Sequence, residues 1–380
     1  MNTDLIKGFK DFTGEEAEKR KFIKSILVET FEKYGFEPAE TPVIENEEFV
    51  RGENKGDEAI SEIYTLKDKG NRNLALRYEF TFQLDRISKS KKLPYKRYQI
   101  GEVFRDEPTN SKRVRQITQC DLDIVGSTIR DEAEVLSIAN EVLSKLRIKN
   151  EIYIGNRALL NEIMDDEGIT KNKEERNQIM REIDKLDKIK EEDIMINLKK
   201  FKAEKLINIF KEKEKYFEKY KNYEQIKKLK EYCSFYGFNI IFQPSLVRGL
   251  SYYNGNVWEI KTKEMRESIC GGGSYLVNDI QSTGISFGLE RLSILFNSFN
   301  KKEKILVLSL NQDEKAIKFS QKLRDKGKNV VIFYGKPTKA LDYANSYKIN
   351  EVIFIGEEEV KKGKAKIKNM QTGKENFIDL

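Results

Sequence analysis

Polar and apolar side chains alternate along residues 113–124, and this alternation constrains the fold more than any other feature of the chain. Successive side chains of a β-strand point to opposite faces of the sheet. One face of this segment, interrupted only by an isoleucine, would carry Arg113, Arg115, Gln119, Asp121 and Asp123. The other face would be mainly apolar, with Thr118, Cys120, Leu122 and Ile124. We therefore expect a strand that buries one face in a core and presents arginines and acids on the other.

The preceding segment, residues 98–105, is also strand-like, so the two segments are expected to pair across a basic loop. In one interpretation, arginines near the loop bind phosphate, since a guanidinium offers two parallel donors, and the deeper carboxylates bind a cationic or hydrogen-bonding ligand. In the other, the pair is a surface hairpin whose charges form ion pairs along the strand. The residues alone leave both interpretations open.

Hydrophobic spacing predicts the remaining elements of residues 1–156. Helices are expected over residues 15–34 and 130–146, and Gly35 is suited to end the first of them. Extended segments are expected at residues 36–45, 71–78 and 151–155.

Residues 157–237 differ in composition from their surroundings, because Lys and Glu dominate and Gly and Pro are almost absent. Their apolar residues fall at helical spacing, which predicts a helical insertion with solvated charged faces. Strand signals return over residues 238–248, and a helix is expected from Leu289. Between them, further strands are expected at residue 258 and at residues 269–275 and 284–288.

Residues 304–380, which follow a short linker, alternate strand and helix signals, which predicts a small α/β domain with a mainly parallel sheet. Its expected strands and helices are residues 305–310, 312–325, 330–334, 338–347 and 352–355. Residues 365–380 are expected to form a hairpin that turns at Gln371-Thr372-Gly373. The chain would thus comprise residues 1–156, an insertion at 157–237, the continuation at 238–299, and the domain at 304–380.

The composition excludes several kinds of chemistry. The 380 residues include no histidine, which excludes Ser-His and Cys-His catalysis and histidine metal sites. The three cysteines form no CxxC pair, so neither a disulfide framework nor a zinc ribbon is expected. The formal net charge of +7 allows a polyanionic partner without requiring one. We find no signal peptide and no apolar run of membrane-spanning length, and we expect a cytoplasmic protein without membrane contact.

Three short motifs resemble those of the class II aminoacyl-tRNA synthetases. The segment Phe104-Arg105-Asp106-Glu107, between two strands, is similar to the FRxE of their motif 2. The first helix and the extended segment with Pro42 resemble motif 1, and Gly288-Leu289-Glu290-Arg291 resembles motif 3. The three occur in the family's order. The resemblance implies an α+β catalytic domain, in which helices flank an antiparallel sheet, and a homodimer.

Two further segments are similar to those of the histidine–tRNA ligases within that class. Leu246-Val247-Arg248-Gly249-Leu250-Ser251-Tyr252-Tyr253 resembles their LVRGLDYY signature, and Cys270-Gly271-Gly272-Gly273-Ser274-Tyr275 resembles their GGGRYD segment. Residues 115–124 resemble the archaeal and eukaryotic form of motif 2, and residues 304–380 look like the α/β anticodon-binding module. The resemblance implies an enzyme that activates histidine with ATP and transfers it to histidine tRNA.

The resemblance also implies which residues bind ATP. Arg105 would bind the α-phosphate, with Arg248 nearby as the family's distinctive catalytic arginine. Arg113 and Arg291 would reach the outer phosphates, Glu107 would serve the adenine, and Mg²⁺ would accompany the nucleotide. Such a transfer requires positioning and charge neutralisation more than a proton acceptor, so a chain without histidine can perform it.

For histidine, the resemblance places Glu79 at the α-amino group, with Thr81 and Gln119, provided that residues 74–82 are extended. Asp123 and Tyr253 are the candidates for the imidazole, because a carboxylate and a phenol can satisfy both its N–H and its lone pair. Tyr252 is either a further group of this pocket or a core aromatic.

Some positions depart from the family's pattern. Ser251 replaces the Asp of RGLDYY, and Ser274 and Leu276 replace the Arg and Asp of GGGRYD. Thr109 stands in the motif 2 loop where Gln is common. The run of three glycines at residues 271–273 permits either a close backbone approach to a ligand or a bulge.

Two other functions remain possible. A non-catalytic, histidine-sensing regulatory subunit of ATP phosphoribosyltransferase resembles the same catalytic fold, and so does a synthetase-like domain that binds tRNA without charging it. The presence of all four ATP-binding arginines and of an anticodon-type domain favours the enzyme over the regulatory subunit, and the amino-acid pocket, which looks intact, argues against the tRNA-binding domain.

Overall fold

The computed structural model describes residues 2–52, 58–109, 114–186, 189–249, 251–299 and 303–380. They fall into two compact units, Met1–Phe299 and Asn300–Leu380. No helix in these ranges is long and apolar enough to span a membrane. The linker expected at residues 300–303 lies almost entirely outside the described ranges.

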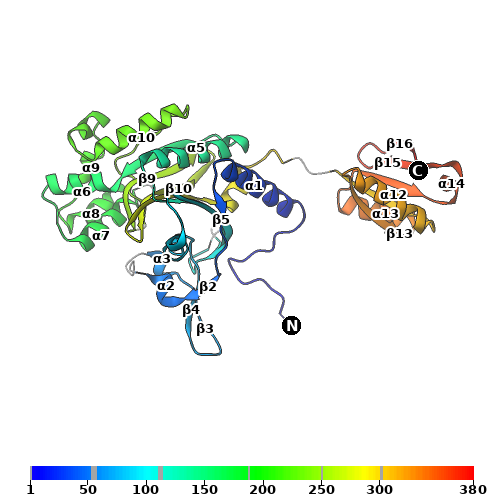
Figure 1. Cartoon of the computed structure of the whole chain (residues 1–380), viewed down its shortest axis with the longest axis horizontal. Coiled ribbons are helices and arrows are strands. Elements are labelled where there is room, and N and C mark those ends of the chain that lie inside the picture. Colours follow the sequence, from blue (N-terminus) through cyan, green and yellow to red (C-terminus); the bar gives the residue numbers. More distant parts are fainter. Residues whose placement is uncertain (1, 53–57, 110–113, 187–188, 250, 300–302) are drawn as a thin grey trace. The chain divides into compact units, whose positions relative to one another are not determined.

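The first unit is built on an eight-stranded sheet in the order β1-β5-β6-β11-β10-β9-β7-β8 (Figure 1). The strands from β5 to β7 pair antiparallel, whereas the edge strands β1 and β8 pair parallel with their neighbours. The strands are β1 (Glu37–Pro38), β5 (Tyr95–Phe104), β6 (Gln116–Val125), β7 (Glu151–Asn156), β8 (Ile241–Phe242), β9 (Tyr253–Thr262), β10 (Met265–Val277) and β11 (Ile280–Gly288). This confirms the expected sheet flanked by helices.

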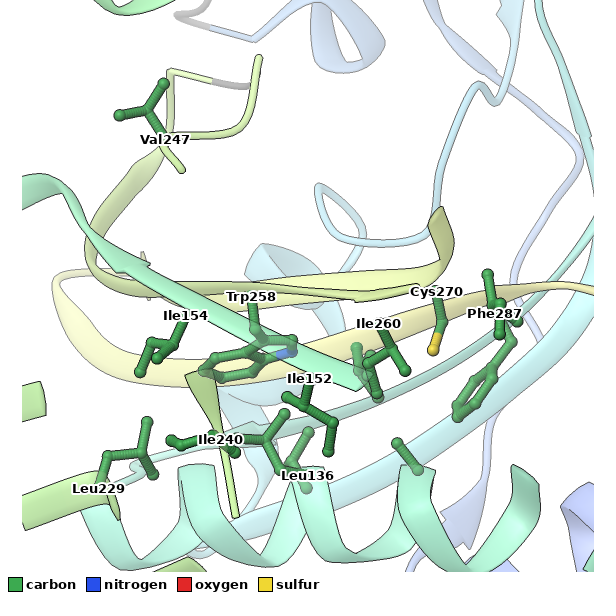
Figure 2. Packing of buried hydrophobic residues seen from close by; sticks show 14 of the residues in the cluster. Leu136, Ile152, Ile154, Leu229, Ile240, Val247, Trp258, Ile260, Cys270 and Phe287 are labelled. Atoms are coloured by element: carbon green, nitrogen blue, oxygen red, sulfur yellow. The ribbon is translucent and has the colours of Figure 1, made fainter. Parts of the chain in front are cut away.

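Helices α1 (Gly14–Lys33), α5 (Ile129–Lys145) and α11 (Leu289–Leu295) cover one face of the sheet. Their apolar residues share one core with the strands: Leu27 and Leu136 from the helices pack in the same cluster as Leu122, Trp258 and Phe287. In Figure 2, Trp258, Ile260 and Cys270 of the strands lie over the helix that carries Leu136. The opposite face carries buried polar residues of β6 beside a second apolar cluster, which includes Tyr253, Val257 and Tyr275.

Helix α1 ends as its sequence predicts. Gly35 has φ +80°, a left-handed conformation that favours glycine. Its N–H donates to the carbonyl of Glu32 at 2.9 Å, and that of Phe36 donates to Phe31 at 3.1 Å. These two bonds form a Schellman motif, which satisfies carbonyls that the helix end would otherwise leave unpaired. The chain is thereby turned into β1.

The described residues of the segment expected as an insertion form a succession of short helices. They are α6 (Arg157–Asp166), α7 (Lys173–Ile183), α8 (Glu191–Lys199), α9 (Leu206–Ile209), the 3₁₀ helix η2 (Glu214–Lys219) and α10 (Tyr223–Phe235). Their buried residues, among them Leu159, Ile179 and Ile226, belong to the same core cluster as Trp258 of the sheet. The insertion therefore packs as part of the unit's main core.

A small second sheet, in the order β2-β4-β3, lies in the same unit. Its strands are β2 (Ile44–Asn46), β3 (Thr65–Lys67) and β4 (Asn73–Leu76), and the short helices α2 (Glu47–Arg51), α3 (Glu58–Ser61), α4 (Leu84–Ile87) and η1 (Ser88–Ser90) accompany it. The expected extension of residues 74–82 is wrong beyond Leu76. The side chain of Arg77 turns away to donate to the carbonyls of Thr41 at 2.7 Å and Glu102 at 2.8 Å.

The expected strand at residues 238–248 is also mostly absent. Only Ile241–Phe242 pairs, parallel to β7, and the chain then leaves the sheet as an irregular segment. The Gln243 N–H still donates to the Ile154 carbonyl at 2.8 Å, whereas Arg248 has φ +57°. This segment carries Arg248 across the end of the sheet instead of along it.

The second unit has a five-stranded sheet in the order β13-β12-β14-β15-β16. Its elements are β12 (Lys304–Ser309), α12 (Asp313–Asp325), β13 (Asn329–Tyr334), α13 (Pro337–Ser346), β14 (Glu351–Ile355), α14 (Glu357–Lys362), β15 (Lys364–Asn369) and β16 (Glu375–Asp379). The α/β pattern and the final hairpin are as predicted. The expectation of a mainly parallel sheet needs correction, because β15 and β16 pair antiparallel. Helix α14 was not predicted.

Candidate active site

The polar residues of β6 lie on the sheet face opposite to the helices, and they are buried. Gln119, Asp121 and Asp123 are 7%, 5% and 5% exposed, while Cys120 and Leu122 between them enter the helical core. The predicted alternation is therefore confirmed. Charges on a surface hairpin would be solvated, so the burial of these three side chains does not fit that interpretation.

Gln119 connects the acids of this face to Arg105. Its amide nitrogen donates to Asp121 at 3.1 Å and to the Ser286 hydroxyl at 2.9 Å. Its amide oxygen accepts from Nη2 of Arg105 at 3.0 Å, and Nε of Arg105 donates to the Tyr78 carbonyl at 3.1 Å. The guanidinium is thus held from two sides at the end of β5.

Three buried carboxyls, Glu79, Asp121 and Asp123, form what we call the acid cluster. Burial raises the pKa of Glu79 to about 7, partly offset by Arg105, and Asp121 adds to the rise. Burial also raises the pKa of Asp121 to about 7, with Asp123 as the next cause. Acids that raise one another's pKa in a buried site carry negative charge that their neighbouring arginines only partly offset, so they are suited to bind a cationic group such as an ammonium.

Asp123 is held by two residues that the sequence did not point to. Its Oδ2 lies 3.0 Å from Nη2 of Arg97, and its Oδ1 accepts from the hydroxyl of Tyr275. Arg97 is its direct partner across the β5–β6 pair. Tyr275 lies within the glycine-rich segment, so alternation along β10 could have placed it in the site. Nothing local to Arg97 marks it.

Three tyrosines enclose the acid cluster. Ring centroids lie 4.6 Å apart for Tyr252 and Tyr253, 5.6 Å for Tyr252 and Tyr275, and 6.3 Å for Tyr253 and Tyr275. The Tyr252 hydroxyl donates to Glu79 at 3.4 Å. All three rings also pack in one apolar cluster, so Tyr252 is both a core aromatic and a neighbour of the acids.

Arg248 lies where the irregular segment meets the glycine run. Its Nη1 is 3.2 Å from Glu259 of β9, and a Cβ at Gly271 would lie 2.1 Å from the same nitrogen. The glycine therefore gives room to a side chain of the site itself. Nη1 of the buried Arg157 donates to the carbonyls of Val247 and Arg248, each at 3.3 Å, which fixes the backbone here.

Arg291 completes a group of guanidiniums with Arg105 and Arg248, which we call the arginine group. Its Nη1 donates to the Ser268 carbonyl at 2.7 Å. Burial lowers the pKa of Arg291, and the positive charges of Arg248 and Arg105 lower it further, against the effect of Glu267. Guanidiniums that disfavour one another's charge form a site suited to phosphate groups.

The other predicted site residues are placed as follows. Glu107 is 2% exposed beyond the end of β5, and Thr81 lies half-buried in the turn after Phe80. Arg113 lies outside the described residues. Of the departures, Ser274 donates to Glu132 at 2.6 Å on the helical face, away from the acid cluster, and Leu276 is 49% exposed. The side chain of Thr109 packs against Gly8, and Ser251 lies half-buried in a turn.

A substitution at Gly155 of β7 can test the path of the segment that carries Arg248. A Cβ at Gly155 would lie 1.9 Å from the Leu246 carbonyl oxygen, so this segment must move in Gly155→Ala. We expect the free energy of unfolding to fall by about 1–3 kcal/mol, as for other overpacked sites. Chemical denaturation measures it. Gly70→Ala, whose Cβ would meet only the end of the Asp68 side chain at 3.3 Å, is the control, and equal stability of the two variants would contradict the placement.

Comparison with known proteins supplies the deciding observation. The family model described as Histidyl-tRNA synthetase matches residues 8–292, and the one described as Anticodon binding domain matches residues 304–380. The chain belongs to the histidyl-tRNA synthetase family. Enzymes of this family are ATP-dependent aminoacyl-tRNA ligases. The resemblance seen in the sequence, and the fold that it implied, are confirmed.

Individual relatives agree with this family. "Histidine--tRNA ligase 1" of Bacillus cereus (strain ATCC 10987 / NRS 248) is 33% identical over all of this chain and 96% of that protein. "Histidine--tRNA ligase" of Methanocaldococcus jannaschii is 32% identical over 98% of this chain and 97% of that protein.

Solved structures share the histidyl-tRNA synthetase fold. The histidyl-tRNA synthetase of Nostoc sp. PCC 7120 superposes with a TM-score of 0.85 at 24% identity, covering 100% of this chain and 97% of that one. A structure from Bacillus halodurans C titled "ATP phosphoribosyltransferase regulatory subunit/histidyl-tRNA synthetase" has a TM-score of 0.77 at 19% identity over 93% and 98% of the two chains. At these identities the likeness concerns the fold alone, which does not separate ligase from regulator.

Proposed function

We propose that this chain is a histidine–tRNA ligase, which joins histidine to the AMP part of ATP with release of diphosphate and then transfers it to the 3′ end of histidine tRNA. The observation that carries the proposal is the position of Arg105. It hydrogen-bonds to Gln119 beside the acid cluster, and its charge acts on both Glu79 and Arg291. One guanidinium thus faces both a site for a cation and a site for phosphates.

In this proposal the acid cluster binds the amino acid. Glu79 accepts from the α-ammonium group, with Gln119 and Thr81 beside it. Asp121 supplies a second negative charge there, since it lies close enough to raise the pKa of Glu79. Asp123 and Tyr253 face the imidazole, and Tyr252 positions Glu79 through its hydroxyl. A ring without matching polar atoms would leave these buried groups unpaired, which is the basis of selectivity.

The arginine group binds ATP. An oxygen of the histidine carboxylate attacks the α-phosphorus, a new O–P bond forms, and the bond to the diphosphate breaks. The carboxylate is already ionised at neutral pH, so no general base is needed. Arg105 and Arg248 neutralise charge at the α-phosphate, Arg291 and Arg113 hold the outer phosphates, and Glu107 serves the adenine.

The remaining assignments rest on the family. Among the described residues, no group of three or more His, Cys, Asp or Glu side chains could hold a metal ion, so we propose that Mg²⁺ arrives on the phosphates of ATP. We also propose a cytoplasmic homodimer. Residues 1–156 and 238–299 would form its catalytic domain, residues 157–237 its insertion, and residues 304–380 the domain that binds the anticodon.

Histidine-dependent exchange of radiolabelled diphosphate into ATP tests the function. We expect exchange with histidine and none with the other proteinogenic amino acids. The alternative, a regulatory subunit of ATP phosphoribosyltransferase, would bind histidine in calorimetry and show no exchange. Charging of histidine tRNA transcripts then tests the second step. Exchange without charging would contradict the complete ligase while keeping the activation site.

A further inference from the structure

Arg97 is a fully buried arginine whose role the ligase reaction described above does not explain. Its Nη2 donates to the carbonyl of Phe80 at 2.9 Å and lies 3.0 Å from Oδ2 of Asp123. Its side chain is 0% exposed and that of Asp123 is 6% exposed. Nε and Nη1 of Arg97 have no hydrogen-bond acceptor among the described residues.

Such an arrangement is costly for folding. Removing two charges from water takes more free energy than their attraction commonly returns, and apolar substitutes often stabilise a protein as well or better. Two donors without acceptors add to that cost. Stability alone therefore does not account for an ion pair at this place, and a role in the adjacent site does.

Titratable groups of β5, β6, β9 and β10 face this ion pair, whereas β11 places Gly284 opposite Asp123. The titratable groups are Asp121 on β6, Tyr275 on β10, Tyr253 on β9 and Tyr95 on β5, with Glu79 acting on Tyr253 from the other side of the acid cluster. Burial raises the pKa of Asp123, and Arg97 and the Tyr275 hydroxyl act against that rise. Arg97 is the cation beside Asp123, whereas Arg105 acts on Glu79.

The charges of the site leave room for one further cation. Three carboxyls of the acid cluster face two guanidiniums, Arg97 and Arg105. The α-ammonium group of a bound amino acid supplies the third positive charge. A protonated imidazole would add a fourth positive charge to a site with three carboxyls, and this charge would lie beside Arg97. A buried site disfavours such an excess.

We propose that Arg97 is a specificity-determining positioning residue, which keeps Asp123 as a compensated carboxylate so that the site accepts histidine with a neutral imidazole ring. This inference rests on the proposed function. Asp123 then accepts a hydrogen bond from the ring N–H without drawing a proton onto the other ring nitrogen. Without Arg97, the uncompensated carboxylate favours the protonated ring.

The test compares histidine with 1,2,4-triazole-3-alanine, an analogue whose ring stays neutral over the range used. The measured ratio is kcat/KM for histidine divided by kcat/KM for the analogue, both in ATP–diphosphate exchange. The titration of Glu79 and Asp121 cancels in this ratio, because both substrates carry the same ammonium group. Free histidine has an imidazole pKa of about 6, below the usual side-chain value of about 6.5, so between pH 7.5 and pH 5.0 its neutral fraction falls about tenfold. We therefore expect the wild-type ratio to fall about tenfold.

Arg97→Met should abolish this fall, leaving the ratio flat or rising toward pH 5.0. Arg97→Lys, which keeps the charge, should restore the fall. Arg97→Met/Asp123→Asn, which removes both charges, should restore it as well. Arg86→Met, which breaks an ion pair of 2.7 Å with Glu45 outside the acid cluster, is the control and should behave as wild type.

A tenfold fall in Arg97→Met, equal to that of wild type, would overturn the inference. So would a flat ratio in the wild type, which needs no variant and holds even if Arg97→Met does not fold. Absence of exchange with either substrate in wild type at pH 7.5 would instead refute the proposed function. The two failures are thereby distinguishable.

Discussion

Arg248→Ala should lower the kcat of histidine-dependent ATP–diphosphate exchange by at least about 1000-fold while histidine still binds. The side chain lies against the backbone at Gly271, and its charge acts on Arg291, so its loss removes positive charge from the arginine group that we propose to bind the phosphates. The Nη1 contact to Glu259 and the two carbonyl bonds from Arg157 fix its position. Exchange kinetics and histidine calorimetry measure the two effects.

Two further variants sharpen this expectation. Arg248→Lys keeps a charge but loses the planar fork, so we expect an intermediate loss of about 10- to 100-fold. Arg130→Ala, on α5 at the helical face, removes an arginine whose Nε donates to the Tyr232 hydroxyl at 3.3 Å, and it should leave exchange unchanged. An unchanged rate in Arg248→Ala would remove this arginine from the ATP site.

Glu79→Gln should raise the KM for histidine about 100-fold at pH 8, with a much smaller effect on kcat. The substitution keeps the shape of the side chain and removes the charge that would face the α-ammonium group. Losing one partner of a buried charge pair costs about 3 kcal/mol, which corresponds to that factor. The KM for histidine in the exchange reaction is the measurement.

The raised pKa of Glu79 adds a pH dependence with a definite sign. The Glu79 carboxyl binds an ammonium group only when the carboxyl is ionised. Because the pKa of Glu79 is about 7, its contribution to histidine binding is present above that pH and lost below it. In wild type the KM should therefore rise as the pH falls through about 7. In Glu79→Gln this part of the rise should disappear, leaving the shares contributed by Asp121 and by protonation of the imidazole of histidine.

Glu132→Gln is the matched control for Glu79→Gln. Burial raises the pKa of Glu132 to about 7 as well, but this carboxyl accepts from Ser274 and Asn256 on the helical face of the sheet. Its substitution should change stability and leave the KM for histidine within about twofold of wild type. A large increase in that KM in both variants would show that loss of folding, rather than loss of a ligand contact, produces the effect.

The contact between Ser274 and Glu132 also bears on the departures from the family's pattern. Ser274 replaces an arginine, and its hydroxyl meets a buried carboxyl on the helical side, not the amino-acid site. Tyr275, the next residue, faces Asp123 because side chains alternate along β10. The departure at residue 274 therefore leaves the acid cluster intact.

The sequence by itself determined the features that depend on local periodicity. Alternation along β6 placed Gln119, Asp121 and Asp123 on one face, since the pleat of a strand has a period of two residues. Helical spacing predicted α1 and the insertion, and Gly35 predicted the end of α1 because few other residues adopt its left-handed conformation. The order of the motifs gave the family.

Only the tertiary structure decided which distant residues meet in the site. Arg97 faces Asp123 because the β5–β6 register places the two opposite each other, and register depends on pairing over the whole strand. Glu79 reaches the site from a loop, where no periodicity predicts a direction. Arg248 reaches it because its segment crosses β7 at Gly155, the position where a larger residue would collide with the Leu246 carbonyl. Local pattern fixes which face a side chain takes, whereas contacts between segments far apart in the chain fix which side chain it meets.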